Sequence, residues 1–322
     1  LRQGEEKFCF SVVFEMTPKA EIVNQWIGKT IIESNRRFTY QEAQKVIEDK
    51  AGEYSEYILP LWSLAEIMRN KRFKAGAINF ESEEVKFHLD EKAKPIGVYV
   101  KESKEANWLI EEFMLLANKK VAEFIGKQKQ KNKAKTFVYR VHDEPNQEKL
   151  NIFKELIGKF GYTLNDKSRS SLAKSFNSLF EKINGKGEQT MISMIALRTM
   201  SKAIYTTDNI GHYGLGFPYY THFTSPIRRY PDLMVHRLLE LYLEDKPSVN
   251  KEVFEQRCEH CSNMEKKAAE AERMSVKYKQ AEFLLDKVGK IFEGVISGVS
   301  KWGIYVLLDE SKCEGLVPIK VI

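Results

Sequence analysis

The sequence has no long apolar run and few cysteines. No hydrophobic stretch approaches the roughly 20 residues that span a bilayer, which excludes an integral membrane protein. Four cysteines in 322 residues are too few for a disulfide scaffold. The first residue is Leu1, and nothing after it reads as a signal peptide. We therefore expect a protein of the reducing cytoplasm with no membrane partner, and we infer no obligate protein partner from the sequence.

Clustered metal ligands are scarce as well. The nine aspartates are scattered, and the two nearest, Asp232 and Asp245, are 13 positions apart. The stretch from Cys258 to Cys261 is a lone CxxC with no second pair of ligands elsewhere in the chain. Because such a pair inside a helix can simply pack, we favour packing over a zinc site. The sequence predicts no metal site of its own.

What the chain does contain is typical of a folded, slightly basic protein. Hydrophobic residues make up 43% and charged residues 30%. Lysine plus arginine exceeds aspartate plus glutamate by 51 − 45 = 6, which permits a polyanionic partner without requiring one.

Periodicity predicts an α+β chain in which a long helix is followed by short β runs from about Lys287 onward. A capping-box pattern opens a helix at Thr39. The other expected elements are a strand over 8–14, a helix over 59–70, a hairpin of 77–80 with 85–89, a helix over 106–126, a strand over 136–141, helices from 147 to about 205, a helix ending at 243, and a helix over 252–287. Short β runs with glycine turns follow, so we place domains at 1–286 and 287–322.

The stretch from Gly211 to Asp232 has the most chemical content. Ser225 and Pro226 can open a helical turn whose free N–H groups favour an anion. Arg228 and Arg229 would lie in that turn, where guanidinium groups match phosphate oxygens. Aromatic rings stand just before it and could stack on bases: Tyr213, Phe217, Tyr219, Tyr220 and Phe223.

Two questions stay open for this stretch. Pro231 either kinks a helix that began earlier or marks the true start of the long helix. The rings and arginines either face a nucleic acid or form a buried aromatic loop in which the arginines pair with carboxylates.

The last residues read as strands of an OB-type barrel. Three short runs fit this pattern, at 289–299, 302–306 and 314–318, where a complete barrel has five strands. Trp302 and Tyr305 lie on or beside the usual nucleic-acid face of such a barrel, or else they only pack within it.

Several segments together resemble the ribonuclease II / ribonuclease R family of RNB-domain, processive 3′→5′ exoribonucleases, closest to the ribonuclease R branch. The segment HFTSPIRRYPD at 222–232 is long and irregular, and the segments at 36–40 and 110–118 also match. The resemblance implies an RNB catalytic-domain fragment, with a mixed antiparallel sheet and long helices, followed by a truncated OB-type barrel of the S-one kind.

The activity implied by the resemblance is sequence-nonspecific hydrolysis of RNA from its single-stranded 3′ end to 5′-nucleoside monophosphates. The family uses Mg²⁺ held by an aspartate cluster, whose motif lies upstream of the segment that matches Leu1 and Arg2. The chain is therefore expected to be inactive alone. The alternative is a non-catalytic RNA-binding protein that retains the fold.

The resemblance also assigns roles to single residues. Arg228 is implied to stabilise charge at the scissile phosphate, and Arg229 to contact the RNA backbone or the protein. Tyr40 matches a tyrosine of the RNA-selective channel, and Glu111 a carboxylate that reads the ribose 2′-hydroxyl. Further expected RNA contacts are Tyr220, His222, Ser225, Tyr230, Trp302 and Tyr305, with Phe80 on the 3′-terminal base and Glu272 near it.

Some of these roles have alternatives. Trp108, Met114 and Leu115 stand three or four positions from Glu111, which predicts partly apolar surroundings for its carboxylate; otherwise Glu111 is an ordinary exposed helix residue. Phe80 is a core residue in the other interpretation, and Glu270 competes with Glu272.

Overall fold

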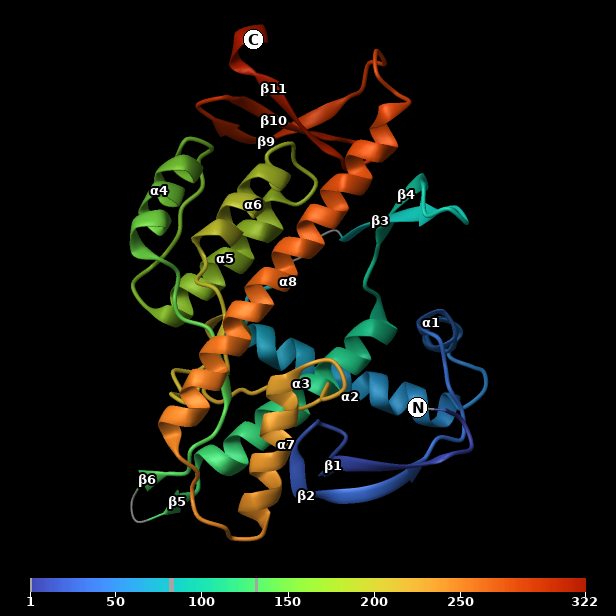
Figure 1. Ribbon diagram of the computed structural model, residues 1–322, viewed down its shortest axis with the longest axis vertical. Helices are drawn as coiled ribbons and strands as arrows, with labels where there is room; N and C mark the ends of the chain where they lie inside the picture. The colour runs from blue at the N-terminus through green and yellow to red at the C-terminus, as the bar shows by residue number, and fades with distance from the viewer. Residues whose placement is uncertain (1, 81–83, 131–132) are drawn as a thin grey trace. The chain divides into compact units, whose positions relative to one another are not determined.

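The computed structural model describes residues 2–80, 84–130 and 133–322, and it divides the chain into two compact units (Figure 1). The first unit contains residues 1–77, 103–143 and 202–262, and the second contains 78–102, 144–201 and 263–322. Within the described residues, every pairing between named strands is antiparallel. The α+β class is therefore confirmed. Compactness groups the C-terminal strands with earlier helices, so the sequence boundary near Lys287 stays a prediction.

The first unit is built on a long hairpin and three long helices. Its elements are β1 (Glu6–Met16), β2 (Ile22–Glu33), α1 (Tyr40–Asp49), α2 (Ser55–Lys74), α3 (Glu105–Gly126), β5 (Lys129–Gln130), β6 (Lys133–Ala134), β7 (Tyr139–Val141), β8 (Ile204–Thr206), the short 3₁₀ turn η1 (Tyr213–Leu215), α7 (Tyr230–Leu243), and α8 (Lys251–Leu285) as far as Ser262. The helices and the first strand expected from periodicity are present at nearly the expected positions.

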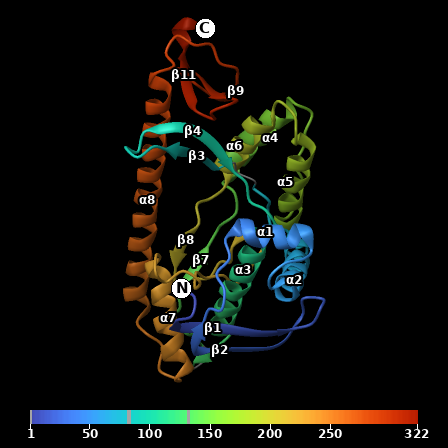
Figure 2. The same ribbon diagram turned by 90° about the vertical axis from the view of Figure 1, so that its right-hand side faces the viewer.

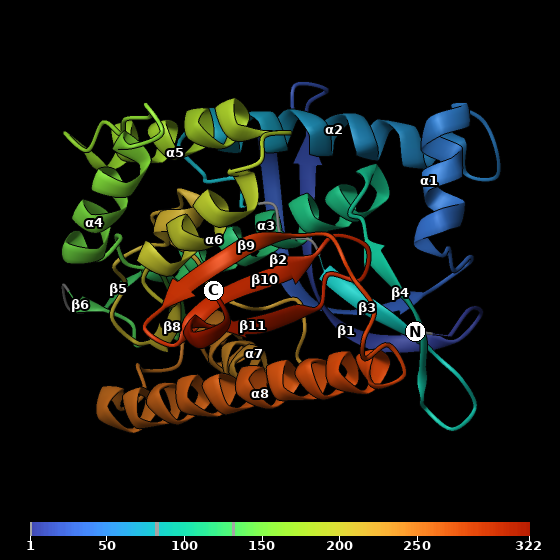
Figure 3. The same cartoon turned by 90° about the horizontal axis from the view of Figure 1, so that it is seen from above.

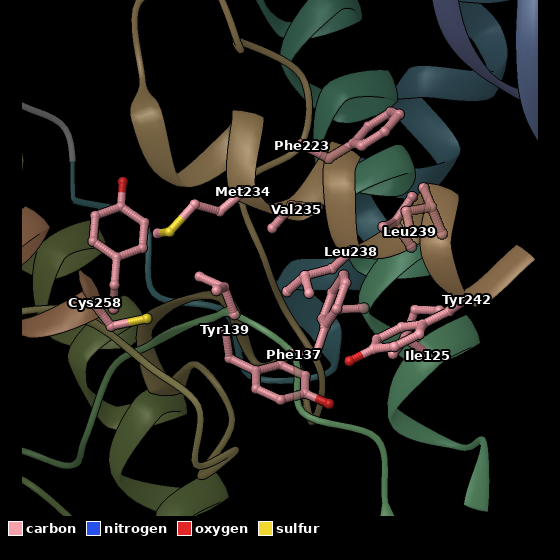
Figure 4. Close-up of a cluster of buried hydrophobic side chains, with 14 of the residues drawn as sticks. Ile125, Phe137, Tyr139, Phe223, Met234, Val235, Leu238, Leu239, Tyr242 and Cys258 are labelled. Carbon is pink, nitrogen blue, oxygen red and sulfur yellow. The ribbon is translucent and has the colours of Figure 1, made fainter. Parts of the chain in front are cut away.

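A buried cluster of side chains from α3, β7 and α7 forms the core of this unit (Figure 4). Val121 and Ile125 lie one turn apart on α3, and Val235 and Leu239 lie one turn apart on α7, so each helix presents an apolar stripe. All four side chains are fully buried. This core fixes the start of α7, which follows the most informative stretch of the sequence.

The first turn of α1 contains the capping box that the sequence around Thr39 predicted. The Thr39 hydroxyl accepts a hydrogen bond from the Glu42 N–H at 3.2 Å, and the Glu42 carboxylate accepts one from the Thr39 N–H at 2.7 Å. Each side chain satisfies a backbone donor that the helix leaves unpaired. The predicted capping box at Thr39 is confirmed.

The second unit contains a hairpin, three helices, the rest of α8 and a small sheet. Its elements are β3 (Glu84–Leu89), β4 (Pro95–Lys101), α4 (Gln147–Gly158), α5 (Arg169–Ile183), α6 (Gln189–Thr199), β9 (Gly294–Ser300), β10 (Gly303–Leu308), β11 (Glu314–Pro318) and the short η2 (Ile319–Val321). Figure 2 shows the β3–β4 hairpin, and Figure 3 shows β9, β10 and β11 side by side. This three-stranded antiparallel sheet, in the order β11-β10-β9, is consistent with the OB-type fold expected there.

Two strand predictions need correction. Residues 77–80 do not form a strand, and β3 pairs instead with β4. The Asn79 N–H donates to the Asn177 side chain at 3.0 Å, so a side chain satisfies backbone that a strand would have paired. Trp302 lies in the turn between β9 and β10 rather than within a strand. Among the described helices, none combines the length and apolar composition that crossing a bilayer requires.

Candidate functional site

The loop of residues 222–232, called here the signature loop, leaves the core at its first residues. Phe223 is 5% exposed and belongs to the buried cluster of the first unit. Its carbonyl oxygen is 2.7 Å from Nε2 of His236, which lies on α7. A ring nitrogen and a carbonyl at this distance form a hydrogen bond in which the imidazole donates. The loop is thus attached to α7 at its beginning.

A second attachment comes from Asp232, in the first turn of α7. Its side chain is 0% exposed and accepts hydrogen bonds from the Ser225 N–H at 2.7 Å and from Arg229 Nη2 at 2.8 Å. The sequence pattern predicts no separate role for Asp232. The signal that could have revealed it is its place as the third residue of the helix, where a carboxylate commonly captures preceding backbone N–H groups.

The two attachments decide the conformation of the loop. The Ser225 carbonyl accepts from the N–H groups of Arg228 and Arg229 at 3.3 and 3.0 Å, which closes a turn over the intervening residues. Helix α7 begins only at Tyr230, with Arg229 as its N-cap and Pro231 in its first turn. The turn expected at Ser225 is therefore present, but it is a single short turn that is separate from α7. Pro231 marks the true start of the long helix.

The two neighbouring arginines have different environments. Arg229 is 20% exposed and paired with the buried Asp232. Arg228 is exposed, as is Ile227 before it. In the part of the chain that the structure describes, the Arg228 side chain makes no hydrogen bond or ion pair. The turn therefore presents one exposed guanidinium to solvent, while its neighbour is held by the protein.

Most of the aromatic residues before the turn do not present their faces to solvent. Tyr213, Tyr220 and Phe223 are 2%, 5% and 5% exposed, so the expectation that these rings stack on bases is not supported by their packing. The Tyr220 hydroxyl accepts a hydrogen bond from Asn118 on α3 at 3.2 Å, and burial raises the pKa of this phenol. The RNA contact of Tyr220 stays a prediction, and the buried ring has no accessible face on which a base could stack.

His222 is neutral in this fold. Burial, together with the positive charges of Arg229 and Arg140, lowers the pKa of its imidazole to about 2. Its Nδ1 lies 2.8 Å from the Tyr205 hydroxyl. His222 can therefore offer a hydrogen bond to a ligand but no positive charge at neutral pH.

Two further candidates lie on the helices of the first unit. Tyr40 is the first residue of α1 and is 51% exposed, so its ring is accessible. The surroundings of Glu111 on α3 include charged groups as well as apolar ones. Its Oε1 atom is 3.2 Å from Arg72 Nη2 and 3.9 Å from Arg69 Nη1, and both arginines come from α2. The interpretation of a carboxylate among apolar neighbours missed these cations.

Four candidates belong to the second unit. Phe80 has its ring 5.4 Å from that of Phe180, and Glu272 is exposed on α8. Trp302 is 64% exposed beneath the Lys301 ammonium, at 4.8 Å, while Tyr305 is partly buried on β10. The structure does not place this unit relative to the signature loop, so a site shared with Arg228 stays a prediction.

The described residues do not fit a metal site. Nowhere in the described ranges do three or more histidine, cysteine, aspartate or glutamate side chains gather closely enough to hold an ion. Cys258 of the CxxC stretch is fully buried, and burial raises the pKa of its thiol to about 12. A thiol in that state is a poor zinc ligand, because zinc binds the thiolate.

The family model for the RNB domain matches residues 1–245 of the chain. The chain therefore belongs to the RNB-domain family. Within that family it is similar to proteins described as ribonuclease R. It is 35% identical over 335 residues to ribonuclease R of Thermotoga maritima, covering 100% of this chain and 46% of the relative. It is 33% identical over 333 residues to ribonuclease R 2 of Lactococcus lactis, covering 99% of this chain and 49% of the relative.

A solved structure agrees with this assignment. The fold is similar to that of Mycoplasma genitalium ribonuclease R in complex with ribose methylated single-stranded RNA, with a TM-score of 0.89 and 27% identity. That match covers 100% of this chain and 51% of the other chain. The chain thus spans about half the length of the curated relatives it matches.

Proposed function

We propose that the chain is part of a ribonuclease R-like enzyme that hydrolyses RNA in the 3′→5′ direction to 5′-nucleoside monophosphates, and that it binds the single-stranded 3′ end. Support comes from the RNB-domain match and from the similarity to a ribonuclease R structure that holds single-stranded RNA. The net charge of +6 is compatible with a polyanionic ligand.

The observation that carries the proposal is the exposed guanidinium of Arg228, which makes no ion pair within the described residues, on a turn fixed to α7 at both ends. A guanidinium fork matches the oxygens of a phosphate group. Because the turn is already fixed, the cation needs little reorganisation to stabilise negative charge as the phosphorus is attacked. Arg228 is the residue we assign to this role, whereas Arg229 contributes by holding the turn through Asp232.

We assign further RNA contacts to other exposed groups in each of the two units. The rings of Tyr40 and Tyr230 are 51% and 48% exposed and can stack on bases. Glu111 accepts a hydrogen bond from a ribose 2′-hydroxyl, and the C-terminal sheet with Trp302 acts as the beginning of an S-one type RNA-binding domain. Stacking and phosphate contacts do not depend on base identity, so binding is sequence-nonspecific.

The resemblance implies Mg²⁺ for the hydrolysis, and a bound Mg²⁺ would activate water and neutralise the leaving oxygen. The described residues of this chain do not form a site for it. We therefore assign to the chain the binding and orientation of RNA, and to Arg228 the stabilisation of charge at the phosphate. A cytoplasmic location remains part of the proposal.

The test compares RNA binding by the purified chain with that of two arginine variants. Fluorescence anisotropy with a labelled single-stranded oligoribonucleotide gives Kd over a range of salt concentrations. Arg228→Ala should weaken binding about tenfold and lower the slope of log Kd against log salt by about 0.7, as expected for one phosphate contact. Arg237→Ala removes an exposed arginine from α7 and serves as the matched control.

Equal losses in the two variants, or no loss in either, would contradict a specific role for Arg228. The alternative function, a non-catalytic RNA-binding protein of the same fold, predicts the same binding result. The two functions are distinguished by an assay of the longer protein. Release of nucleoside monophosphates from RNA by that protein would exclude the non-catalytic alternative.

A further inference from the structure

Helices α2 and α3 pack together in the first unit (Figure 2). Two arginines of α2 and two glutamates of α3 form a cluster of ion pairs between these helices. Arg72 and Glu112 form its buried part, with side chains that are 7% and 3% exposed. Arg72 Nε lies 3.2 and 3.3 Å from the two carboxylate oxygens of Glu112, and Nη2 also donates to Glu112. This fork-to-carboxylate contact fixes the plane of the Arg72 guanidinium.

Aromatic rings fix the second arginine. The Arg69 guanidinium lies 4.6 Å from the centre of the Trp108 ring and 4.9 Å from that of Phe73. The Arg72 guanidinium lies 4.7 Å from the same Phe73 ring. Both cations are thus immobilised from two directions, by carboxylates and by ring faces.

Glu111 is the accessible member of the cluster. Its side chain is 48% exposed, and its Oε1 atom accepts from Arg72 Nη2 at 3.2 Å. Among the residues that the structure describes, no hydrogen bond or ion pair is made to Oε2 of Glu111. One carboxylate oxygen is therefore held by the protein and the other is available to a ligand.

We propose that Arg72 is a positioning residue that holds Oε1 of Glu111, so that Oε2 is presented as an oriented acceptor for a ribose 2′-hydroxyl. This inference rests on the proposed function, in which Glu111 reads the sugar. An ionised carboxylate only accepts hydrogen bonds, so it favours a sugar that carries a hydroxyl donor. A 2′-deoxy sugar lacks that donor, and a 2′-O-methyl sugar has lost its hydrogen.

Arg72 selects RNA only indirectly. Without it, Glu111 would be a flexible side chain in water, and the ordering of its rotamers would offset much of the gain from one hydrogen bond. With it, the carboxylate is already oriented before the sugar arrives. The discrimination between ribose and deoxyribose should therefore depend on Arg72, although Arg72 itself touches no ligand.

The experiment measures Kd by anisotropy for matched single-stranded RNA, DNA and 2′-O-methyl RNA of one sequence. The unaltered chain should prefer RNA about tenfold over each of the other two. The double variant Arg72→Met, Glu112→Leu replaces the buried pair with apolar side chains, a change that cores often tolerate. In this variant the ratio of the Kd for DNA to the Kd for RNA should fall close to one, while the Kd for DNA is unchanged.

Three comparisons complete the design. Glu111→Gln tests the proposed function, and Lys154→Ala, which breaks an ion pair with Asp166 in the second unit, controls for the loss of any ion pair. Arg72→Lys keeps the charge opposite Glu112 but loses the fork, and it should reduce the preference in a chain whose circular dichroism is unchanged. It serves as the readout if the double variant does not fold.

The outcomes separate the two ideas. If Glu111→Gln abolishes the preference and the folded Arg72 variants retain it in full, the inference about Arg72 is wrong and the role of Glu111 stands. If the unaltered chain binds RNA and DNA equally, or Glu111→Gln keeps the preference, the role proposed for Glu111 fails. Loss of the preference in both Glu111 and Arg72 variants, but not in Lys154→Ala, supports the inference.

Discussion

Replacing Asp232 with alanine tests whether the buried carboxylate holds the signature loop. The side chain is 0% exposed and satisfies both the Ser225 N–H and Arg229 Nη2. Removing one partner of a buried ion pair costs about 3–5 kcal/mol when the other charge stays buried. Because Arg229 is 20% exposed, it can partly reach water, so we expect a loss of about 2–3 kcal/mol.

A milder variant tests the same reasoning. Asn keeps an oxygen that can accept from the Ser225 N–H but loses the charge that pairs with Arg229, so Asp232→Asn should cost about 1–2 kcal/mol. For a unit of this size, the alanine variant should lower Tm by about 5–10 °C. Asp208→Ala is the control, because it removes an exposed aspartate whose pair with Lys251 lies at the surface and should matter little.

Urea and thermal unfolding followed by circular dichroism measure the stability, and anisotropy with single-stranded RNA measures the second consequence. Since the turn that carries Arg228 is anchored by Asp232, the alanine variant should also lose RNA affinity at a temperature where it remains folded. A stability within about 0.5 kcal/mol of the unaltered chain would refute the anchoring argument. A stability loss with unchanged RNA affinity would refute the link between the anchor and Arg228.

Three other outcomes are expected. His222 has a pKa of about 2 in the folded chain and an ordinary value in the unfolded one, so the unfolded state binds the extra proton and stability falls as pH drops below about 6.5. At pH 5.5 the loss is about 1.4 kcal/mol, and urea unfolding of His222→Gln at pH 7.5 and 5.5 should lack this contribution. Gly126→Ala should lower the free energy of unfolding by about 1–3 kcal/mol, because the new Cβ would lie 2.5 Å from the Tyr219 ring. Gly158→Ala, where no atom lies within 4 Å of the new Cβ, should raise it by about 0.5–1 kcal/mol, and thermal unfolding measures both changes. The purified chain with Mg²⁺ should release little nucleoside monophosphate from single-stranded RNA, as measured by chromatography, and robust release would contradict the expectation that the chain is inactive alone.

The elements that could be predicted from the sequence are those whose causes are local. The Thr39 capping box needs only residues three positions apart, and α3 needs only the spacing of its apolar residues. The strand expected at 77–80 failed because the choice between a strand and an irregular segment was made by a distant side chain, Asn177, which accepts from the Asn79 N–H. No pattern within those four residues carries that information.

The same limit applies to the candidate site. The residues around Glu111 predicted partly apolar surroundings, since periodicity identifies neighbours on the same helix. The groups that determine its chemistry are Arg69 and Arg72, which α2 brings from about 40 positions away. Pairing between helices depends on packing, so a sequence motif can indicate a functional carboxylate without indicating what orients it.

The signature loop shows how two identical neighbours acquire different environments. Composition offered a choice between arginines that face a nucleic acid and arginines that pair with carboxylates, and the structure pairs Arg229 with a carboxylate and leaves Arg228 exposed. Asp232 can neutralise one guanidinium, and the turn closed by the Ser225 carbonyl directs Arg229 toward it and leaves Arg228 exposed. The buried pair of Arg229 and Asp232 therefore holds the exposed guanidinium of Arg228 in place. With only one arginine, the loop could have a guanidinium that fixes the turn or one that is exposed to solvent, but not both.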